Sequence, residues 1–259
     1  MARIAVPFHL NEHRDVLTLP VEPELVLHEP VPAEPTWRAL LPLYEELAAV
    51  VERVNGDGPL TVFSGDCCAS VGVLAGLRRG GLEPGVVWID AHGDFNTPAT
   101  TISGYVGGMV LAFITGRGDD DGVGARLGLT PVPDERVVLV DGRDLDPAEA
   151  ELIASTEVRR VALDEVEAVL RVALPTGPLF LHIDLDVIDP SIFPGLLFPA
   201  AGGADLDAVL GAAAAVVNTG RLVTTSIGCT WHPDESDPAV CREVLAAVLG
   251  VVEGDGRPA

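Results

Sequence analysis

The sequence predicts an α/β protein in which a doubly wound, mostly parallel sheet carries helices on both faces. Three observations support this fold class. Short apolar runs recur along the chain and end at Gly, Pro or Asp, helix-like stretches lie between them, and hydrophobic residues make up 48% of the 259 residues. Continuous apolar runs are typical of buried parallel strands, and their alternation with helices indicates βαβ units.

The expected elements follow one another in a regular order. The apolar runs predict buried strands at Leu60 to Phe63, Gly85 to Ile89, Arg136 to Val140, Pro178 to Ile183 and Leu222 to Ile227. Helices are expected at Pro35 to Val54, Ser70 to Arg79, Pro147 to Ala154, Asp164 to Ala173, Leu206 to Asn218 and Ala239 to Glu253. Because no Ser/Gly-rich or charged linker divides the chain, we expect one domain over residues 1–259.

Two segments are unusually rich in glycine, Gly104 to Gly108 and Gly116 to Gly128. The second also contains Asp119, Asp120 and Asp121. Solvated Asp/Gly runs are usually loops, so we expect a mobile acidic loop there and no binding site.

The charge of the chain excludes several classes of protein. Sixteen basic residues against 39 acidic ones give a formal net charge of −23, and so negative a surface repels nucleic acids and anionic lipid head groups. All sixteen basic residues are Arg. The chain therefore has no lysine for Schiff-base chemistry with pyridoxal phosphate or for a phosphate-binding P-loop.

The sequence gives no sign of a targeting segment. It begins Met-Ala-Arg-Ile-Ala-Val-Pro without an apolar stretch of signal-peptide length, and no run reaches the roughly 18 apolar residues of a membrane span. The four cysteines lack zinc-knuckle spacing, and the adjacent Cys67 and Cys68 suit a structural disulfide poorly. We expect a cytoplasmic protein with reduced thiols.

Two short segments carry most of the chemical information. Asp90, His92 and Asp94 occupy alternate positions at the end of an apolar strand, and alternate side chains of an extended chain share a face. A second apolar strand ends in Asp184 and Asp186, which have the same spacing. In an open parallel sheet, ligands gather at the carboxyl ends of the strands, so the two groups can meet in one crevice.

Four aspartates in one crevice would repel one another unless cations neutralise them. Carboxylate oxygens with one imidazole suit Mn²⁺ or a similar six-coordinate ion, and two cations balance the charge better than one. Either group alone has an ordinary structural interpretation, as an Asp pair that anchors a loop or as a hydrogen-bonded His. Their occurrence together, each after a buried strand, favours a metal site.

The two groups resemble the signature segments of the arginase/agmatinase (ureohydrolase) family, at Asp90 to Asp94 and at Asp184 to Pro190. The likeness continues in order through three further segments. Ser64 to Cys68 stands where the family has Gly-Gly-Asp-His-Ser, Ser103 to Met109 where it has Ser-Gly-x-x-His-Gly, and Gly142 to Pro147 resembles Gly-x-Arg-Asp-Val-Asp-Pro. The resemblance implies an arginase-like sheet of about eight strands.

By this resemblance the crevice would hold a binuclear centre of two Mn²⁺ ions, with other divalent metals possible because one expected ligand is a thiolate. The implied ligands are Cys67, Asp90, Asp94 and Asp184 for one cation, and His92, Asp186 and the shared Asp90 and Asp184 for the other. Water activated by the cations would attack the guanidinium carbon. Asp94 would be the catalytic residue that accepts the proton and returns it to the leaving amine. The products would be a urea-type compound and an amine.

Three positions depart from the family pattern. Cys67 replaces a histidine ligand, Gly107 stands where arginases have a proton-relaying His, and Ile227 to Pro233 lacks the Glu that binds the guanidinium. The Cys and the Gly, together with the run His92 to Pro98, resemble the branch that hydrolyses Nω-hydroxy-L-arginine in D-cycloserine biosynthesis. A hydroxyguanidine is less basic than a guanidinium, so it needs less carboxylate to hold it.

The expected substrate is an arginine-like guanidino amino acid, either Nω-hydroxyarginine or arginine. Asn96 and Ser103 match arginase positions that contact the α-carboxylate, and Asp146 matches one near the α-amino group, although Asp-Pro is also a common helix cap. His232, with Trp231 beside it, would line the pocket in place of the absent Glu. The resemblance also implies a homo-oligomer, a trimer or hexamer.

Alternatives from other classes stay open. The chain could be a non-catalytic metal-binding relative or a hydrolase of another guanidino acid, although the implied ligands apart from residue 67 are all present. Amide hydrolysis, as in the related deacetylases, would use a single zinc and a His-His pair that the chain lacks. A haloacid-type phosphatase would need a lysine, and a Thr or Val where this chain has Ile188.

Overall fold

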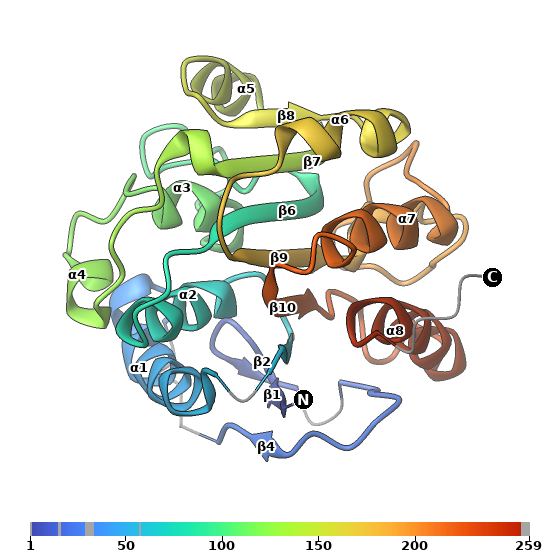
Figure 1. Ribbon diagram of the computed structural model, residues 1–259, viewed down its shortest axis with the longest axis horizontal. Coiled ribbons are helices and arrows are strands. Elements are labelled where there is room, and N and C mark those ends of the chain that lie inside the picture. Colours follow the sequence, from blue (N-terminus) through green and yellow to red (C-terminus); the bar gives the residue numbers. More distant parts are fainter. Residues whose placement is uncertain (1, 15–16, 29–33, 57, 255–259) are drawn as a thin grey trace.

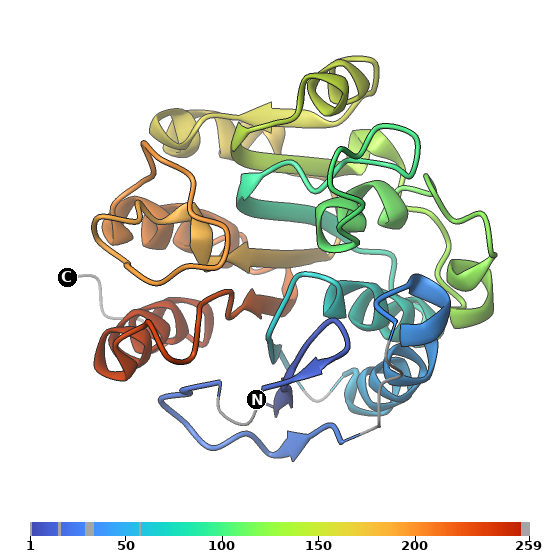
Figure 2. The ribbon, with the colours of Figure 1, turned by 180° about the vertical axis from the view of Figure 1, so that it is seen from behind.

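The computed structural model describes residues 2–14, 17–28, 34–56 and 58–254. A central eight-stranded sheet carries helices on both faces (Figures 1 and 2). Its strands are β1 (Ala2–Val6), β4 (Leu25–Val26), β5 (Leu60–Ser64), β6 (Gly85–His92), β7 (Val137–Asp144), β8 (Arg159–Val161), β9 (Leu179–Asp184) and β10 (Leu222–Gly228). They lie in the order β4-β1-β5-β10-β9-β6-β7-β8, and all neighbouring pairs are parallel. A short antiparallel pair, β2 (Phe8–His9) and β3 (Glu12–His13), lies outside this sheet. The predicted fold class is confirmed.

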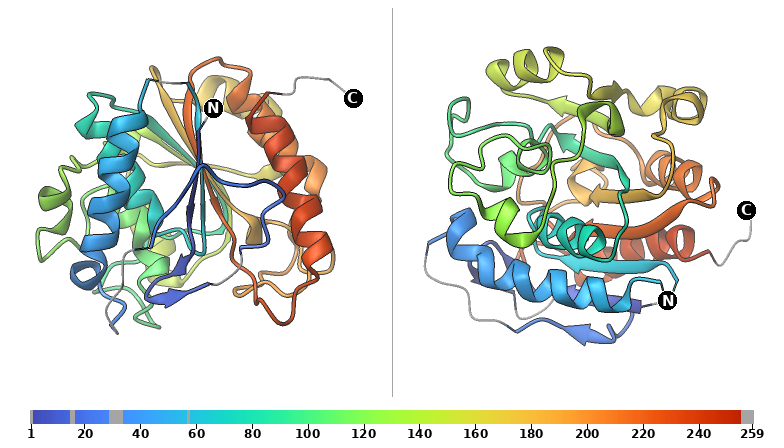
Figure 3. Two further views of the ribbon diagram at one scale, coloured as in Figure 1. Left: turned by 90° about the horizontal axis from the view of Figure 1, so that it is seen from below. Right: turned by 60° about the vertical axis from the view of Figure 1, so that its left-hand side comes forward.

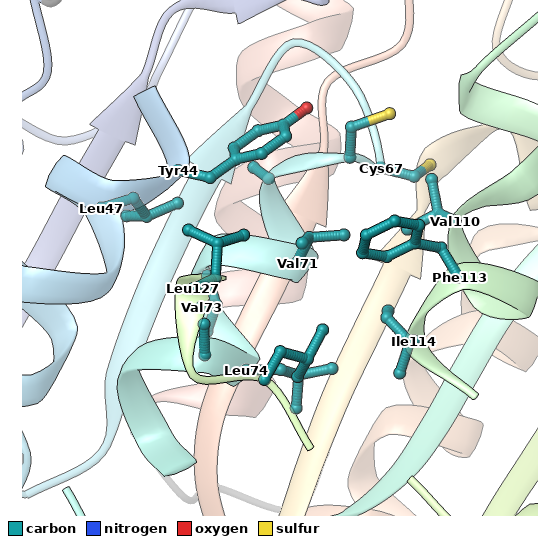
Figure 4. Packing of buried hydrophobic residues seen from close by; sticks show 14 of the residues in the cluster. Tyr44, Leu47, Cys67, Val71, Val73, Leu74, Val110, Phe113, Ile114 and Leu127 are labelled. Carbon is teal, nitrogen blue, oxygen red and sulfur yellow. The ribbon is translucent and has the colours of Figure 1, made fainter. Parts of the chain in front are cut away.

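The helices form one layer on each face of the sheet. On one side lie α1 (Trp37–Val54), α2 (Ala69–Arg79), α3 (Val110–Ile114) and α4 (Val123–Leu127), and on the other α6 (Val166–Ala173), α7 (Leu206–Val217) and α8 (Pro238–Val252) (Figure 3). Helix α5 (Pro147–Ala154) lies near the β7–β8 edge (Figure 1). Each layer buries its own apolar cluster against the sheet. Figure 4 shows Leu47, Leu74, Phe113 and Leu127 packed together from α1 to α4.

The elements predicted from the sequence are all present, with ends that differ by a few residues. Strands β1, β4 and β8 were not predicted. The acidic segment Gly116 to Gly128 is not only a loop, because it contains α4. Both carboxylate oxygens of Asp119 accept hydrogen bonds at the start of that helix, from the backbone N–H groups of Val123 (2.7 Å) and Gly124 (3.0 Å). The aspartate that made the segment resemble a loop therefore stabilises a helix start.

The strand order determines where the site forms. Strands β9 and β10, from late in the sequence, lie between β5 and β6, so four strands from distant parts of the chain end side by side. Residues that follow these strands meet at one edge of the sheet.

All four cysteines are buried and free of disulfide bonds, as expected. Within the part of the chain that the structure describes, no helix has the length and apolarity needed to cross a bilayer.

Candidate active site

A cavity of about 190 Å³ opens at the carboxyl ends of β5, β10, β9 and β6. It brings together the predicted ligands and three of the four predicted substrate contacts. These residues are Cys67, Asp90, His92, Asp94, Asn96, Ser103, Asp146, Asp184 and Asp186. His232 is not among the residues that line the cavity, and its contact with the substrate stays a prediction. The chain turns away after Thr230, and the His232 backbone N–H donates to the Gly195 carbonyl (2.8 Å).

The two strand-end aspartates are held by hydrogen bonds from their own strands and the following loops. Asp90 is 1% exposed and accepts from the Trp88 indole N–H (3.0 Å) and the His92 backbone N–H (2.7 Å). Asp184 is 2% exposed and accepts from the Asp186 backbone N–H (2.9 Å) and, on the same oxygen, from the Thr230 hydroxyl. These bonds orient the carboxylates before any ligand binds.

One potential donor set consists of Cys67, Asp90, His182 and Asp184, whose ligand atoms all lie within 4.8 Å of one another. The Cys67 thiol donates to Asp184 Oδ2 (2.8 Å). His182 was not predicted as a ligand. It is fully buried, its ring stacks on Trp88 at 3.8 Å between centroids, and burial lowers its pKa to about 3. Its ring is therefore neutral.

The nitrogen atoms of His182 differ in their surroundings. Nδ1 lies 3.2 Å from the Ser70 hydroxyl, whereas Nε2 is buried without a hydrogen-bond partner. A buried unpaired nitrogen is costly unless something occupies it, and a neutral imidazole nitrogen is an ordinary metal ligand. The signal for this residue was available in the sequence, because His182 precedes Asp184 by two positions on the same strand and so shares its face.

A second donor set shares Asp90 and adds His92 and Asp186. His92 Nδ1 lies 3.1 Å from Asp186 Oδ2 and 3.4 Å from Asp90 Oδ1. Although burial acts in the opposite direction, hydrogen bonds to these two carboxylates raise the pKa of His92 to about 12. Burial would also raise the pKa of Asp90, but its contacts with His92 outweigh this and lower it.

The remaining carboxyl groups of the cavity favour their protonated forms when no cation is present. Burial, reinforced by the charge of neighbouring aspartates, raises the pKa of Asp94 and Asp186 well above the ordinary range. Burial and the charge of Asp90 raise the pKa of Asp184 to about 7. The cluster therefore has more acidic groups than the surrounding protein can hold as anions, and bound divalent cations would supply the missing positive charge.

Asp94 differs from the other carboxylates. Its backbone lies in the left-handed region, with φ 49°, and its carbonyl oxygen accepts from the N–H groups of Leu111 (2.8 Å) and Ala112 (3.1 Å) at the start of α3. Its Oδ2 atom is buried without a partner, and Asp94 belongs to neither donor set. Buried polar atoms without a partner are uncommon in proteins, which makes Asp94 a candidate functional residue.

The cavity lining also contains the predicted head-group contacts. Asn96 donates to Asp146 Oδ2 (3.1 Å), and the Glu149 carboxylate accepts from the backbone N–H groups of Phe95 (2.7 Å) and Asp146 (3.2 Å). Asp146 and Glu149 also form a capping box at the start of α5. Asp146 thus has both the capping role and the cavity position that the sequence indicated.

Arg143 fixes the loop that follows the second signature segment. Its guanidinium donates to the backbone carbonyls of Asp186 (3.3 Å), Val187 (3.2 Å), Ala200 (2.9 Å) and Ala201 (3.2 Å). Because Arg is always charged, these are strong hydrogen bonds. They connect the metal-ligand loop to the segment that carries Phe198, another cavity residue. No sequence signal indicated Phe198, which belongs to an irregular loop.

Comparison with known proteins agrees with this geometry. The Arginase family model matches residues 13–227, so the chain belongs to the arginase family and is a ureohydrolase, an enzyme of a family that acts on small guanidino substrates. Among its relatives, the N(omega)-hydroxy-L-arginine amidinohydrolase of Streptomyces lavendulae is 35% identical over 232 residues, which cover 86% of this chain and 81% of that protein. The arginase of Brevibacillus brevis is 34% identical over 222 residues, covering 80% and 71%.

Solved structures show the same fold. The arginase of Bacillus cereus matches with a TM-score of 0.86 over 99% of both chains at 23% identity. The arginase of Bacillus caldovelox matches with a TM-score of 0.81 over 98% of both chains at 27% identity.

Proposed function

We propose that this enzyme is a binuclear metal-dependent hydrolase that cleaves the guanidino C–N bond of Nω-hydroxy-L-arginine, with L-arginine as the second candidate substrate. The observation that carries the proposal is the pair of donor sets that share Asp90 inside a buried group of aspartates. The similarity to the Streptomyces lavendulae amidinohydrolase, together with Cys67 and Gly107 in place of histidines, favours the hydroxylated substrate.

The residues of the cavity fit two divalent cations, which would lower the pKa of a bound water and so provide a nucleophile near neutral pH. Cys67, Asp90, His182 and Asp184 would hold one cation, and Asp90, His92 and Asp186 the other. The first set contains a thiol and an imidazole, which favour softer ions such as Zn²⁺ or Co²⁺, whereas the second suits Mn²⁺. Burial and nearby aspartates raise the pKa of the Cys67 thiol, so its ionisation would depend on a cation.

The other cavity residues would orient the substrate and move the proton. The unpaired Oδ2 of Asp94 would accept the proton of the attacking water and return it to the leaving amine. Asn96, Ser103 and Asp146 would hold the amino-acid head group. The products would be hydroxyurea and ornithine, or urea and ornithine from arginine. A trimeric or hexameric assembly and a cytoplasmic location stay predictions.

A substrate panel with metal analysis tests this proposal. The protein is loaded with Mn²⁺, its metal content is measured, and product release is followed from Nω-hydroxy-L-arginine, L-arginine and agmatine. We expect two bound cations, the highest kcat/KM for the hydroxylated substrate and the lowest for agmatine, which lacks an α-carboxylate. Two bound cations without turnover of any guanidino compound would instead support a non-catalytic metal-binding protein, and turnover of another guanidino acid alone would correct the substrate.

The contribution of His182 has a separate readout. In the Co²⁺-loaded protein, the charge-transfer absorption of a thiolate ligand reports on Cys67, and the intensity of the visible bands reports on the coordination number. We expect His182→Asn to weaken binding of one cation and change the visible bands, while Cys67→Ser removes the charge-transfer absorption. A His182→Asn protein with the spectrum and metal content of the wild type would show that the imidazole is not a ligand.

A further inference from the structure

Three aromatic rings from distant parts of the chain gather beside the cavity. Tyr105 and Phe198 line it, with ring centroids 4.9 Å apart, and the buried His9 on β2 stacks against both at 6.0 and 6.2 Å. No role was predicted for any of these residues from the sequence. The cluster faces the same cavity as the donor sets.

Hydrogen bonds fix the direction of the Tyr105 hydroxyl. His9 Nδ1 lies 3.1 Å from the Gly65 carbonyl oxygen, which can only accept, so the Nδ1 atom carries the proton. In this tautomer Nε2 is an acceptor, and the Tyr105 hydroxyl at 3.3 Å donates to it. The lone pairs of Tyr105 Oη are left free to accept a hydrogen bond from a ligand.

Gly107 is the position that makes room for this tyrosine. A Cβ atom at residue 107 would lie 2.2 Å from Tyr105 Cε1 and 2.6 Å from its hydroxyl oxygen, far closer than non-bonded atoms approach. Any other residue at 107 therefore requires the ring to move. The tyrosine ring occupies the space into which a side chain at 107 would extend, which gives the absence of a histidine there a structural reason.

The charge of the cavity lining indicates what this hydroxyl would meet. Within the described lining, His92 is the one basic side chain, and Asp66, Asp144, Asp146 and Glu149 add carboxyl groups to those of the donor sets. Such a lining favours ligands with N–H donors. Burial, with nearby acidic groups, raises the pKa of Tyr105 above its ordinary value, so its oxygen is a neutral acceptor.

We propose that Tyr105 accepts a hydrogen bond from the guanidino end of the substrate, and that His9 is a positioning residue that aims its lone pairs. This inference rests on the proposed function. Hydrogen bonds to a carboxylate are roughly twice as strong as those between neutral groups, so a neutral acceptor gives a charged guanidinium little advantage over a weakly basic hydroxyguanidine. Tyr105 thus acts as a specificity-determining residue for the guanidino group.

Removing one hydroxyl group tests this role. We expect Tyr105→Phe to lower kcat/KM for Nω-hydroxy-L-arginine about tenfold, mainly through KM, as the loss of one hydrogen bond in a binding site predicts. The matched control is Tyr44→Phe, the same change in the other tyrosine of the chain, which lies in the α1 core and does not line the cavity. It should stay within about twofold of the wild type.

A ligand without a guanidino group separates this role from general damage. L-Ornithine shares the amino-acid head group, so its dissociation constant, measured by calorimetry, should be the same in Tyr105→Phe and wild-type protein. If Tyr105→Phe weakened the binding of ornithine and of hydroxyarginine by the same factor, the hydroxyl would only support the shape of the cavity. Unchanged hydroxyarginine kinetics in a folded Tyr105→Phe protein would also overturn the proposal. Absence of wild-type turnover would instead refute the proposed function.

Double variants test the contacts that position the tyrosine. Gly107→Ala should displace the ring and cause a loss similar to that of Tyr105→Phe, and the double variant should lose little more than either single one. His9→Phe should raise KM about threefold in the wild-type background and have no effect in Tyr105→Phe. Losses that multiply in either double variant would show that these residues act independently of the tyrosine. If Tyr105→Phe fails to fold, the kinetics of Gly107→Ala test the role of the tyrosine in its place.

Discussion

The two walls of the cavity are built differently. On the metal-ligand wall, Asp90 and Asp184 sit at strand ends, are almost fully buried and accept backbone hydrogen bonds at short range. On the substrate wall, Tyr105 and Phe198 come from irregular segments, and Phe198 is 37% exposed. The register of the sheet fixes the first wall, whereas the second depends on loop contacts. Changes on the first wall should therefore affect cation binding and stability, and changes on the second should affect substrate selection.

The largest effect is expected for Asp184→Ala, which removes a carboxylate from the buried wall. Because the first donor set loses a central member, we expect loss of at least one cation and a fall in kcat/KM of about a thousandfold or more. Metal content and product release measure both outcomes. The control is Asp207→Ala, the same change at an exposed position in the first turn of α7, which should keep full metal content. Retained turnover in Asp184→Ala would contradict the site as described.

Arg143→Ala should remove the hydrogen bonds that hold the loop after Asp186 to the segment that carries Phe198. Loss of its hydrogen bonds to backbone carbonyls should lower the free energy of unfolding by about 2–3 kcal/mol and kcat/KM by about tenfold, because the loop after Asp186 is no longer held. Denaturant titration and kinetics measure these changes. The control Arg136→Ala removes two hydrogen bonds to backbone carbonyls, those of Glu83 and Thr176 near the start of β7, and should leave kcat/KM within about twofold. Equal losses of activity in both variants would argue against a specific role for Arg143.

Removal of the cations should make the stability of the protein depend on pH. When folding raises the pKa of a group, that group stabilises the folded protein at pH values below its pKa in the unfolded chain. This stabilisation is lost as the pH rises to the pKa of the group in the folded protein. For Asp184 the window runs from about 4 to about 7, and for His92 from about 6.5 to about 12. The lowered pKa of His182 acts in the opposite direction below about pH 6.5, but between pH 5 and 8 the two raised groups outweigh it. We expect the metal-free protein to have a Tm several degrees lower at pH 8 than at pH 5, and added cations to stabilise it more at pH 8. A metal-free Tm that rises over this range would exclude these raised pKa values.

The smallest effect is expected for Cys67→His, which exchanges a thiol for a harder donor. Mn²⁺ binding should tighten by about tenfold, because the replaced ligand is the softest of the first set. Competition with a chelator measures the change. The control variant is Cys241→Ser, which replaces another buried cysteine, in α8 and away from the cavity. The Cys241→Ser protein should bind Mn²⁺ as the wild type does. Unchanged affinity in Cys67→His would mean that residue 67 is not a ligand.

The same contrast explains how much could be predicted from the sequence. The alternation of apolar runs with helical stretches was sufficient to predict a parallel sheet. The alternate spacing of Asp90, His92, Asp184 and Asp186 at the ends of such runs then predicted that these residues meet, because strand geometry is regular. His9 and Phe198 could not be predicted, because their position depends on how loops distant in sequence fold against the sheet. His232 was expected in the cavity but lies outside its lining for the same reason, because it belongs to the irregular segment after β10.

The first donor set joins residues that lie 117 positions apart, at Cys67 and Asp184. A cation bound there would act as a cross-link between the β5 and β9 ends of the chain, and closing a loop of this size removes unfolded-state entropy worth about 5 kcal/mol, by analogy with a disulfide. Loss of the ion would thus lower the stability of the central sheet as a whole, and not only that of the cavity.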